Sequence, residues 1–165
     1  GLITERFSKI GSEPSLTTYN LYEVLEESVS YINSRTSQKV EISIKDMEIF
    51  QTISVAVNKQ LFAWVVENLC KNAVDAMEGE GAIWFEISGN GDENIQFDVV
   101  DTGKGIPANR HKTIFKPGYT TKKRGWGLGL SLVKRIIENY HNGKIYVKSS
   151  EPGKGARFRI ELRKA

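Results

Sequence analysis

The chain has 165 residues, of which 39% are hydrophobic and 26% charged, and this suits one compact domain with its own core. No stretch approaches the roughly 18 apolar residues of a membrane-spanning helix, and the start shows no signal-peptide pattern. One cysteine, Cys70, excludes an internal disulfide framework and fits a reducing compartment, so we expect a cytoplasmic domain. The net charge of +3 is too small to favour nucleic acid as a partner.

The spacing of apolar residues predicts three helices and about six strands in α+β order, with a helical layer on one face of a sheet. Residues 2–10 have roughly helical spacing and precede a Gly-Ser-Glu-Pro breaker, so we expect them to end a longer helix. Asn20 and Asn58 are the expected N-caps of the next two helices. The expected helices cover 21–35, 59–77 and about 127–140, and the expected strands cover 40–44, 54–57, 82–88, 94–100, 144–149 and 156–162.

The second expected helix carries Asn68, Asn72 and Asp75 at spacings of four and three, which places them on one face, opposite the apolar stripe. Asparagine disfavours helix interiors because its amide competes for backbone hydrogen bonds, so two of them one turn apart need a reason. Amide oxygens can ligate Mg²⁺, whose octahedral oxygen shell is often completed by substrate phosphates. The alternative is a solvated polar face without a ligand.

Asp101 ends a strand of near-continuous apolar character and precedes Gly103 and Gly105. A carboxylate accepts hydrogen bonds and cannot donate, so it would select a ligand with an amine edge, such as adenine N6. The glycines would let the backbone turn sharply and let a flat ring approach. The alternative is an Asx turn, in which the carboxylate bonds to its own backbone.

A glycine-rich motif over residues 125–131 opens the third expected helix. Exposed backbone N–H groups and the helix dipole favour an anion at such a position, and Lys122, Lys123 and Arg124 lie directly upstream. The whole stretch 102–137 contains no acidic residue, which also indicates an anionic neighbour. The motif lacks the Lys-Ser/Thr pair of a P-loop, and a flexible linker is the alternative.

Taken together and in this order, the motifs resemble those of the ATP-binding catalytic domain of sensor histidine kinases. This superfamily also includes DNA gyrase, MutL and the ninety-kilodalton heat-shock chaperones. The resembling segments are 67–76 (N box), 101–106 (first glycine box), 114–122 (F box), 125–131 (second glycine box) and 153–158 (terminal glycine motif).

The resemblance spans about residues 20–165 and implies a two-layer α/β sandwich of the Bergerat type. A mixed, mostly antiparallel sheet would be covered on one face by three helices, with residues 107–126 as a long ATP lid anchored by Phe115. Residues 15–165 would form the ATP-binding catalytic domain, and residues 1–14 would be the stump of the dimerisation and phosphoacceptor helix with its linker.

The resemblance also implies an ATP and Mg²⁺ site. Asn72 would contact Mg²⁺, Asn68 would support it, and Asp101 would accept the adenine amine. The residues implied in nucleotide binding are Asn68, Asn72, Asp101, Gly103, Gly105, Ile106, Lys122, Lys123, Arg124, Gly127, Leu128, Gly129 and Leu130.

Several positions differ from the family pattern. Asp75 stands where many members carry a lysine aimed at phosphate, Trp126 stands where threonine is common, and Ala156 replaces a threonine that could back up Asp101. Asn68 stands where the gyrase and chaperone branches carry the glutamate that activates water. Asparagine is no base at neutral pH, which favours phosphotransfer over hydrolysis.

The implied function is to present the γ-phosphate of ATP to a histidine on a dimerisation domain absent from this chain, with no catalytic side chain assigned here. His111 and His141 lack acidic neighbours of an acceptor motif, so we expect solvent-facing or capping histidines. The implied partners are that domain and a response regulator, and not nucleic acid. The fragment would be a monomer, and the full protein a homodimer that could be anchored in the inner membrane.

Two alternatives stay open. One is a non-catalytic nucleotide-sensing or docking module with the same fold, which the departures at Asp75, Trp126 and Ala156 motivate. The other is a serine/threonine-directed kinase of the same superfamily, such as an anti-sigma factor. A nucleic-acid binder fits least, since the basic stretch has few interleaved aromatic residues.

Overall fold

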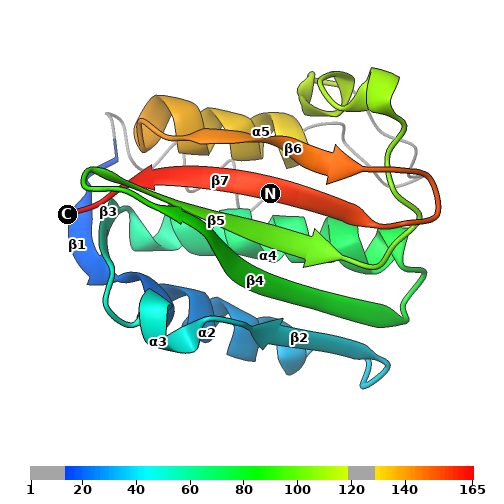
Figure 1. Ribbon diagram of the computed structural model, residues 1–165, viewed down its shortest axis with the longest axis horizontal. Coiled ribbons are helices and arrows are strands. Elements are labelled where there is room, and N and C mark those ends of the chain that lie inside the picture. Colours follow the sequence, from blue (N-terminus) through cyan, green and yellow to red (C-terminus); the bar gives the residue numbers. More distant parts are fainter. Residues whose placement is uncertain (1–13, 119–128) are drawn as a thin grey trace.

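The computed structural model describes residues 14–118 and 129–165 (Figure 1). The expected helix end over 2–10 lies outside the described residues, as do residues 119–126 of the expected lid. The strands are β1 (Thr17–Asn20), β2 (Val40–Ile44), β3 (Ser54–Val57), β4 (Gly81–Asn90), β5 (Asn94–Asp101), β6 (Lys144–Ser150) and β7 (Ala156–Arg163). The helices are α2 (Leu21–Asn33), α3 (Met47–Phe50), α4 (Lys59–Ala76), α5 (Gly129–Arg135) and the π-helix η3 (Ile136–Tyr140), with 3-10 turns η1 (Ala108–Arg110) and η2 (Thr113–Phe115).

Five strands form one mixed sheet in the order β2-β4-β5-β7-β6. Only β2 and β4 are parallel in it, and the other neighbours are antiparallel. The strands β1 and β3 form a separate antiparallel pair. The α+β class and the mostly antiparallel mixed sheet are therefore confirmed.

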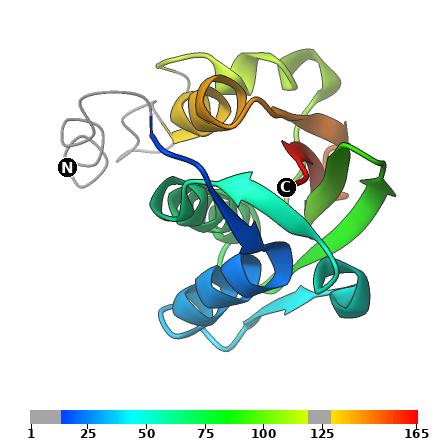
Figure 2. The same cartoon turned by 90° about the vertical axis from the view of Figure 1, so that its left-hand side faces the viewer.

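The helices α2, α4 and α5 form one layer against one face of the sheet, with α4 in the middle (Figure 2). Phe97 of β5 lies where these layers meet, and its ring packs edge-on against Phe62 of α4 at 6.5 Å and against Phe50 at 6.1 Å. All three rings are fully buried. Burying each such side chain contributes about 1.5–3 kcal/mol, so this cluster fixes α4 on the sheet.

The caps and the apolar stripe place α4 as predicted. The side chain of Asn58 accepts a hydrogen bond from the Leu61 N–H at 3.1 Å, and Asn20 caps α2 in the same way through Glu23. The stripe of α4 that the sequence predicts is buried, including Val65 and Leu69. Among the described residues, no helix is both long and apolar enough to cross a membrane.

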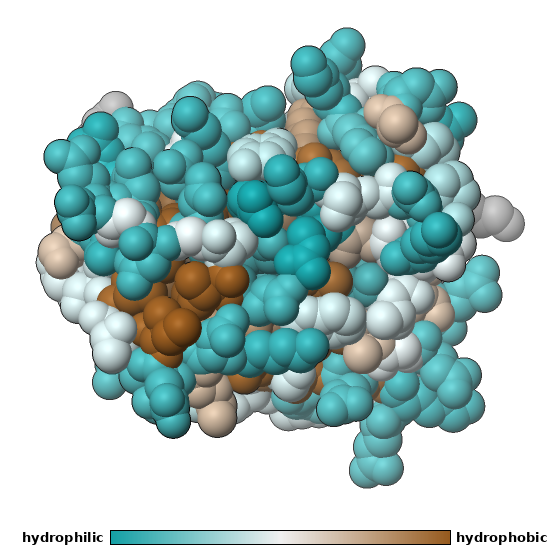
Figure 3. Space-filling model, in the orientation of Figure 1, coloured by the Kyte–Doolittle hydropathy of each residue, from teal (hydrophilic) through white to brown (hydrophobic). Residues whose placement is uncertain are grey.

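The outer face of the sheet carries a charged cluster that the sequence did not predict. Asp98 is fully buried there and accepts hydrogen bonds from Arg157 at 2.7 Å and from Arg159 at 2.8 and 3.0 Å. Burial alone would raise the pKa of Asp98, but the bonds from Arg159, Arg157 and Ser88 hold it below its usual value. This face is largely hydrophilic, with an apolar area over α3 (Figure 3).

Candidate functional site

The helix α4 presents Asn68, Asn72 and Ala76 at successive i, i+4 positions along one edge. Both asparagines are half-buried, whereas Asp75 is exposed. The sequence placed all three opposite the apolar stripe, but the two asparagines flank it, and of the three only Asp75 is exposed. Two amide oxygens on adjacent turns at a half-buried edge can serve as ligands for a hard cation.

Asp101 is the last residue of β5, and its side chain is only 6% exposed. Its Oδ1 accepts a hydrogen bond from the Gly103 N–H at 2.8 Å, and the backbone of Ala156 donates another bond to the carboxylate. Burial raises the pKa of Asp101, and these two bonds oppose that rise. The Asx turn foreseen as an alternative is present, but a carboxylate has about four acceptor sites, so it does not exclude a ligand amine.

The segment after Asp101 packs against the C-terminal end of α4. A Cβ atom on Gly103 would lie 2.8 Å from the Cβ of Ala76, so only glycine fits there. The Lys104 N–H donates to the Ala76 carbonyl at 2.9 Å. Thr102 adds a side-chain link, since its Oγ1 accepts the Ala82 N–H at 3.1 Å. These contacts fix the position of Asp101 relative to α4 and, through Ala82, relative to β4.

The other end of the same edge faces the start of α5. A Cβ atom on Gly129 would lie 3.2 Å from Oδ1 of Asn68, so the glycine lets α5 approach this amide closely. Asn72 lies one helical turn from Asn68 and one turn from Ala76, between the two contact points. The structure thus brings residues of the N box, the first glycine box and the second glycine box to one edge of α4.

Residues 105 and 106 are attached to the turn between β6 and β7. Gly105 has φ +78°, and a Cβ atom on it would overlap the Glu151 carbonyl. The Ile106 N–H donates to Oγ of Ser150 at 2.7 Å, and Ile106 packs partly buried against the core. Sequence reasoning did not single out Ser150, although its position three residues before the terminal glycine motif is a usable signal.

Phe115 anchors the described half of the lid. Its side chain is 7% exposed, and its ring packs edge-on against Phe158 of β7 at 6.1 Å. The ammonium of Lys134 in α5 lies 5.6 Å from the ring centre, within cation–π range. The anchor implied for Phe115 is therefore present.

Several residues expected to bind the nucleotide lie outside the described residues, and so does Trp126. These nucleotide residues are Lys122, Lys123, Arg124, Gly127 and Leu128. Gly129 and Leu130 begin the described part of α5 and are half-buried.

His141 is a buried link between two helices. It is 1% exposed, and its Nε2 accepts the N–H of Asn58, the N-cap of α4, at 3.1 Å. Its Nδ1 lies 2.9 Å from the Ile136 carbonyl, which assigns the proton to Nδ1. Burial lowers the pKa of His141, which favours the neutral ring. His141 thus contacts the N-cap residue of α4, in keeping with the expected capping role, and the alternative that it faces solvent is wrong.

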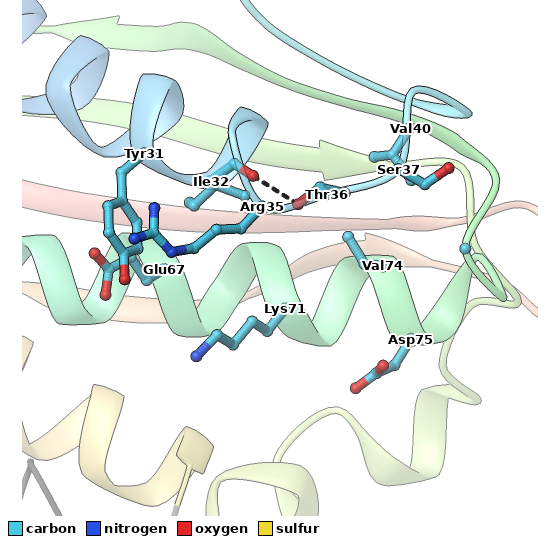
Figure 4. Close-up of a pocket in the computed structure, with 11 residues that line it drawn as sticks. Tyr31, Ile32, Arg35, Thr36, Ser37, Val40, Glu67, Lys71, Val74 and Asp75 are labelled. Carbon is cyan, nitrogen blue, oxygen red and sulfur yellow. Dashed lines mark hydrogen bonds between the residues drawn. The ribbon is translucent and has the colours of Figure 1, made fainter.

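A separate pocket of about 380 Å³ lies on the other side of α4, toward α2 (Figure 4). Tyr31 and Arg35 line it from the end of α2, and Glu67, Lys71 and Asp75 line it from α4. None of the residues implied in nucleotide binding lines this pocket. The edge that carries Asn68 and Asn72 is therefore a different surface of the same helix.

The donor set fits Mg²⁺ bound together with a nucleotide better than a protein-only metal site. Among the described residues, no group of three or more His, Cys, Asp or Glu side chains could hold a metal ion. Mg²⁺ keeps several waters and is commonly bound by few protein oxygens plus substrate phosphates. The amides of Asn68 and Asn72 meet that requirement. Asp101 lies at the far end of the edge, where its carboxylate could accept a hydrogen bond from a nucleobase.

This fold and this arrangement of motifs define an ATP-binding domain of the kind found in histidine kinases. Residues 57–165 match the family described as "Histidine kinase-, DNA gyrase B-, and HSP90-like ATPase", and the chain belongs to this family.

Among its relatives, the sensor histidine kinase ZraS of Salmonella typhimurium is 36% identical over 148 residues, covering 90% of this chain and 31% of ZraS. The chain thus spans less than a third of that relative. The nucleotide-free catalytic domain of histidine kinase ThkA has a TM-score of 0.76 at 28% identity, covering 90% of this chain and 95% of that one. Full-length ShkA in complex with AMPPNP has a TM-score of 0.77 at 25% identity, covering 93% of this chain and 32% of ShkA.

Proposed function

We propose that residues 15–165 bind ATP with Mg²⁺ and present the γ-phosphate to a histidine on a dimerisation domain outside this chain, as the catalytic part of a sensor histidine kinase. The observation that carries the proposal is the edge of α4, where Asn68 faces Gly129 and Ala76 faces Gly103. Family membership and the nucleotide named for ShkA support it.

Each residue of the edge has a proposed task. Asp101 accepts the adenine amine, and Gly103 and Gly105 shape the purine pocket by letting this backbone pack closely against Ala76 and Glu151. Asn72 offers an amide oxygen to Mg²⁺, with Asn68 supporting it through water. The bound Mg²⁺ neutralises phosphate charge when present. Further contacts are proposed for Ile106 and Leu130 on the ring side, and for Lys122, Lys123, Arg124, Gly127, Leu128 and Gly129 on the phosphate side.

The reaction class follows from the residue at position 68. The half-buried amide of Asn68 cannot take a proton from water at neutral pH, so this position supplies no base for hydrolysis. In phosphoryl transfer, positioning and charge neutralisation supply most of the catalysis. The nucleophilic histidine and its proton acceptor would come from the dimerisation domain, to which residues 1–14 would lead.

The remaining partners follow from the same proposal. A response regulator would receive the phosphoryl group from the dimerisation domain. The domain alone would be a monomer in the cytoplasm, and the full protein would be a homodimer, with an inner-membrane anchor if it senses an external signal. Nucleic acid is not among the proposed partners.

Two measurements test this function. Calorimetry with ATP should show binding that strengthens when Mg²⁺ is added, and no heat at millimolar ATP would contradict nucleotide binding. Adding the cognate dimerisation domain with γ-labelled ATP should then label its histidine. Binding without labelling would instead favour the nucleotide-sensing module, for which the exposed Asp75 in place of a lysine is the supporting observation.

A further inference from the structure

We propose that Ser150 is a positioning residue of the adenine site, which sets the segment 104–106 relative to the carboxylate of Asp101. The inference rests on the proposed nucleotide binding and adds to it a residue that lies outside all five motifs of the family resemblance. Ser150 ends β6, is half-buried and pairs with Ala156 of β7.

The hydroxyl of Ser150 uses both of its hydrogen-bonding functions between two separate segments. Its oxygen accepts the Ile106 N–H at 2.7 Å, and it donates to the Gly155 carbonyl at 2.7 Å. A hydroxyl carries one donor and accepts through two lone pairs, so one small side chain suffices for both bonds. Ser150 therefore ties the first glycine box to the terminal glycine motif.

The Gly155 end of this link leads to Asp101. Gly155 has φ +77°, and a Cβ atom on it would overlap the Asp101 carbonyl, so the two backbones are in direct contact. The next residue, Ala156, donates its backbone hydrogen bond to the Asp101 carboxylate. Ser150 thus connects the residue that reads the base with the residues expected to lie along the ring.

The ring Nε2 of His111 also lies 2.9 Å from the Ile106 carbonyl, and two further hydrogen bonds of this segment join backbone groups, which no substitution removes singly. The Gly153 N–H donates to the Lys104 carbonyl at 2.7 Å, and the Lys104 N–H donates to Ala76 on α4. These bonds should keep the segment folded when the Ser150 hydroxyl is lost, while Ile106 and Gly105 shift. The expected result is a misplaced ring surface and not an unfolded domain.

The test compares ATP with purine riboside triphosphate, which lacks the exocyclic amine that Asp101 would read. Calorimetry gives the ratio of the two Kd values for the native domain, for Ser150→Thr and for Ser150→Val. Thr and Val have nearly the same shape, and only Thr retains the hydroxyl. We expect Ser150→Thr to keep the native ratio of the two Kd values. We expect Ser150→Val to reduce the preference for ATP, as given by this ratio, roughly three- to tenfold. The control, Ser149→Ala, changes an exposed neighbour and should leave the ratio unchanged.

A merely structural role would weaken both nucleotides equally and leave the ratio intact, and that result would overturn the inference. So would equal ratios for Thr and Val. If Ser150→Val does not fold, Ser150→Ala replaces it, because alanine adds no bulk at this position. Failure of the proposed function looks different, since the native domain would then bind neither nucleotide.

Discussion

Asp101 has a carboxylate that the fold itself orients. Its bonds from Gly103 and Ala156 fix the plane of the group at the end of β5, and its burial keeps water from competing for the remaining lone pairs. A preoriented acceptor in a poorly solvated position binds an amine more strongly than an exposed one, because it loses less freedom and less hydration on binding. This residue should therefore dominate base recognition.

Asp101→Asn is expected to weaken ATP binding about ten- to hundredfold, the usual worth of a hydrogen bond to a charged partner. The amide loses the charge and must turn its oxygen toward the ligand, against the existing bond from Gly103. Calorimetry measures the change, and Asp92→Asn, in the exposed turn between β4 and β5, is the control. Equal affinities for Asp101→Asn and the native domain would remove Asp101 from the site.

Gly103→Ala is expected to destabilise the domain by about 1–3 kcal/mol, because the added Cβ would meet Ala76 of α4 at 2.8–2.9 Å. Urea unfolding measures the free energy of unfolding. Gly91→Ala is a matched control, since its nearest neighbour, the Asn94 carbonyl, lies at an ordinary 3.5 Å. If both variants lower the free energy of unfolding equally, the close approach of Gly103 to α4 is not the cause of the loss.

At the scale of elements, the sequence predicts what local patterns determine. The capping of α2 and α4 by Asn20 and Asn58 and the alternation in β2 are confirmed because each depends on neighbouring residues. The strand β1 was missed, so the described residues form seven strands in place of the six expected, because the four residues of β1 lack alternation and are stabilised by pairing with β3. The helix α3 was missed because it is one turn long and starts at Asp46 in the left-handed region.

The site shows the same limit. The sequence predicts which residues belong to α4 and to the end of β5, but not how these elements meet. The contacts of Gly103 with Ala76 and of Gly129 with Asn68 join residues far apart in the chain. The links made by Ser150 and His141 are also long-range, and a lone serine or histidine has no spacing that would predict them.

His141 should make the junction of α4 and η3 sensitive to pH. Because burial lowers its pKa below the ordinary value of 6.5, the unfolded chain binds a proton before the folded one does. Its share of stability is therefore complete above that value and is lost as the pH falls below it, by at most about 1.4 kcal/mol per pH unit. Protonated Nε2 could no longer accept the Asn58 N–H.

The measurement is the free energy of unfolding between about pH 5 and 7.5. His141→Gln can still offer an acceptor to Asn58 but does not titrate, so it should show a smaller dependence on pH over this range. His111→Gln, which replaces the other histidine, is the comparison variant, and the effect is assigned to His141 only if His141→Gln changes the dependence more than His111→Gln does. An unchanged dependence in His141→Gln would exclude His141 as the sensitive group.

At the scale of the whole molecule, the two faces of the sheet have separate tasks. The inner face carries the helical layer, in which α4 has the candidate nucleotide edge toward α5 and a distinct pocket toward α2. The outer face is held by charges around Asp98, which is fully buried between Arg157 and Arg159. A buried carboxylate with several charged donors stabilises only as a complete set, because removing it leaves the arginines without their shared partner.

Asp98→Ala should therefore lower the free energy of unfolding by roughly 3 kcal/mol and leave the Kd for ATP unchanged. The stability loss follows from the bonds to Arg157 and Arg159 at 2.7–3.0 Å. The affinity should persist because successive side chains of β5 alternate between faces, which places Asp98 opposite the layer of α4. Urea unfolding and calorimetry on the same variant give both values. A variant that keeps its stability but loses ATP binding would mean that the outer face takes part in the site, and the separation of the two faces would be wrong.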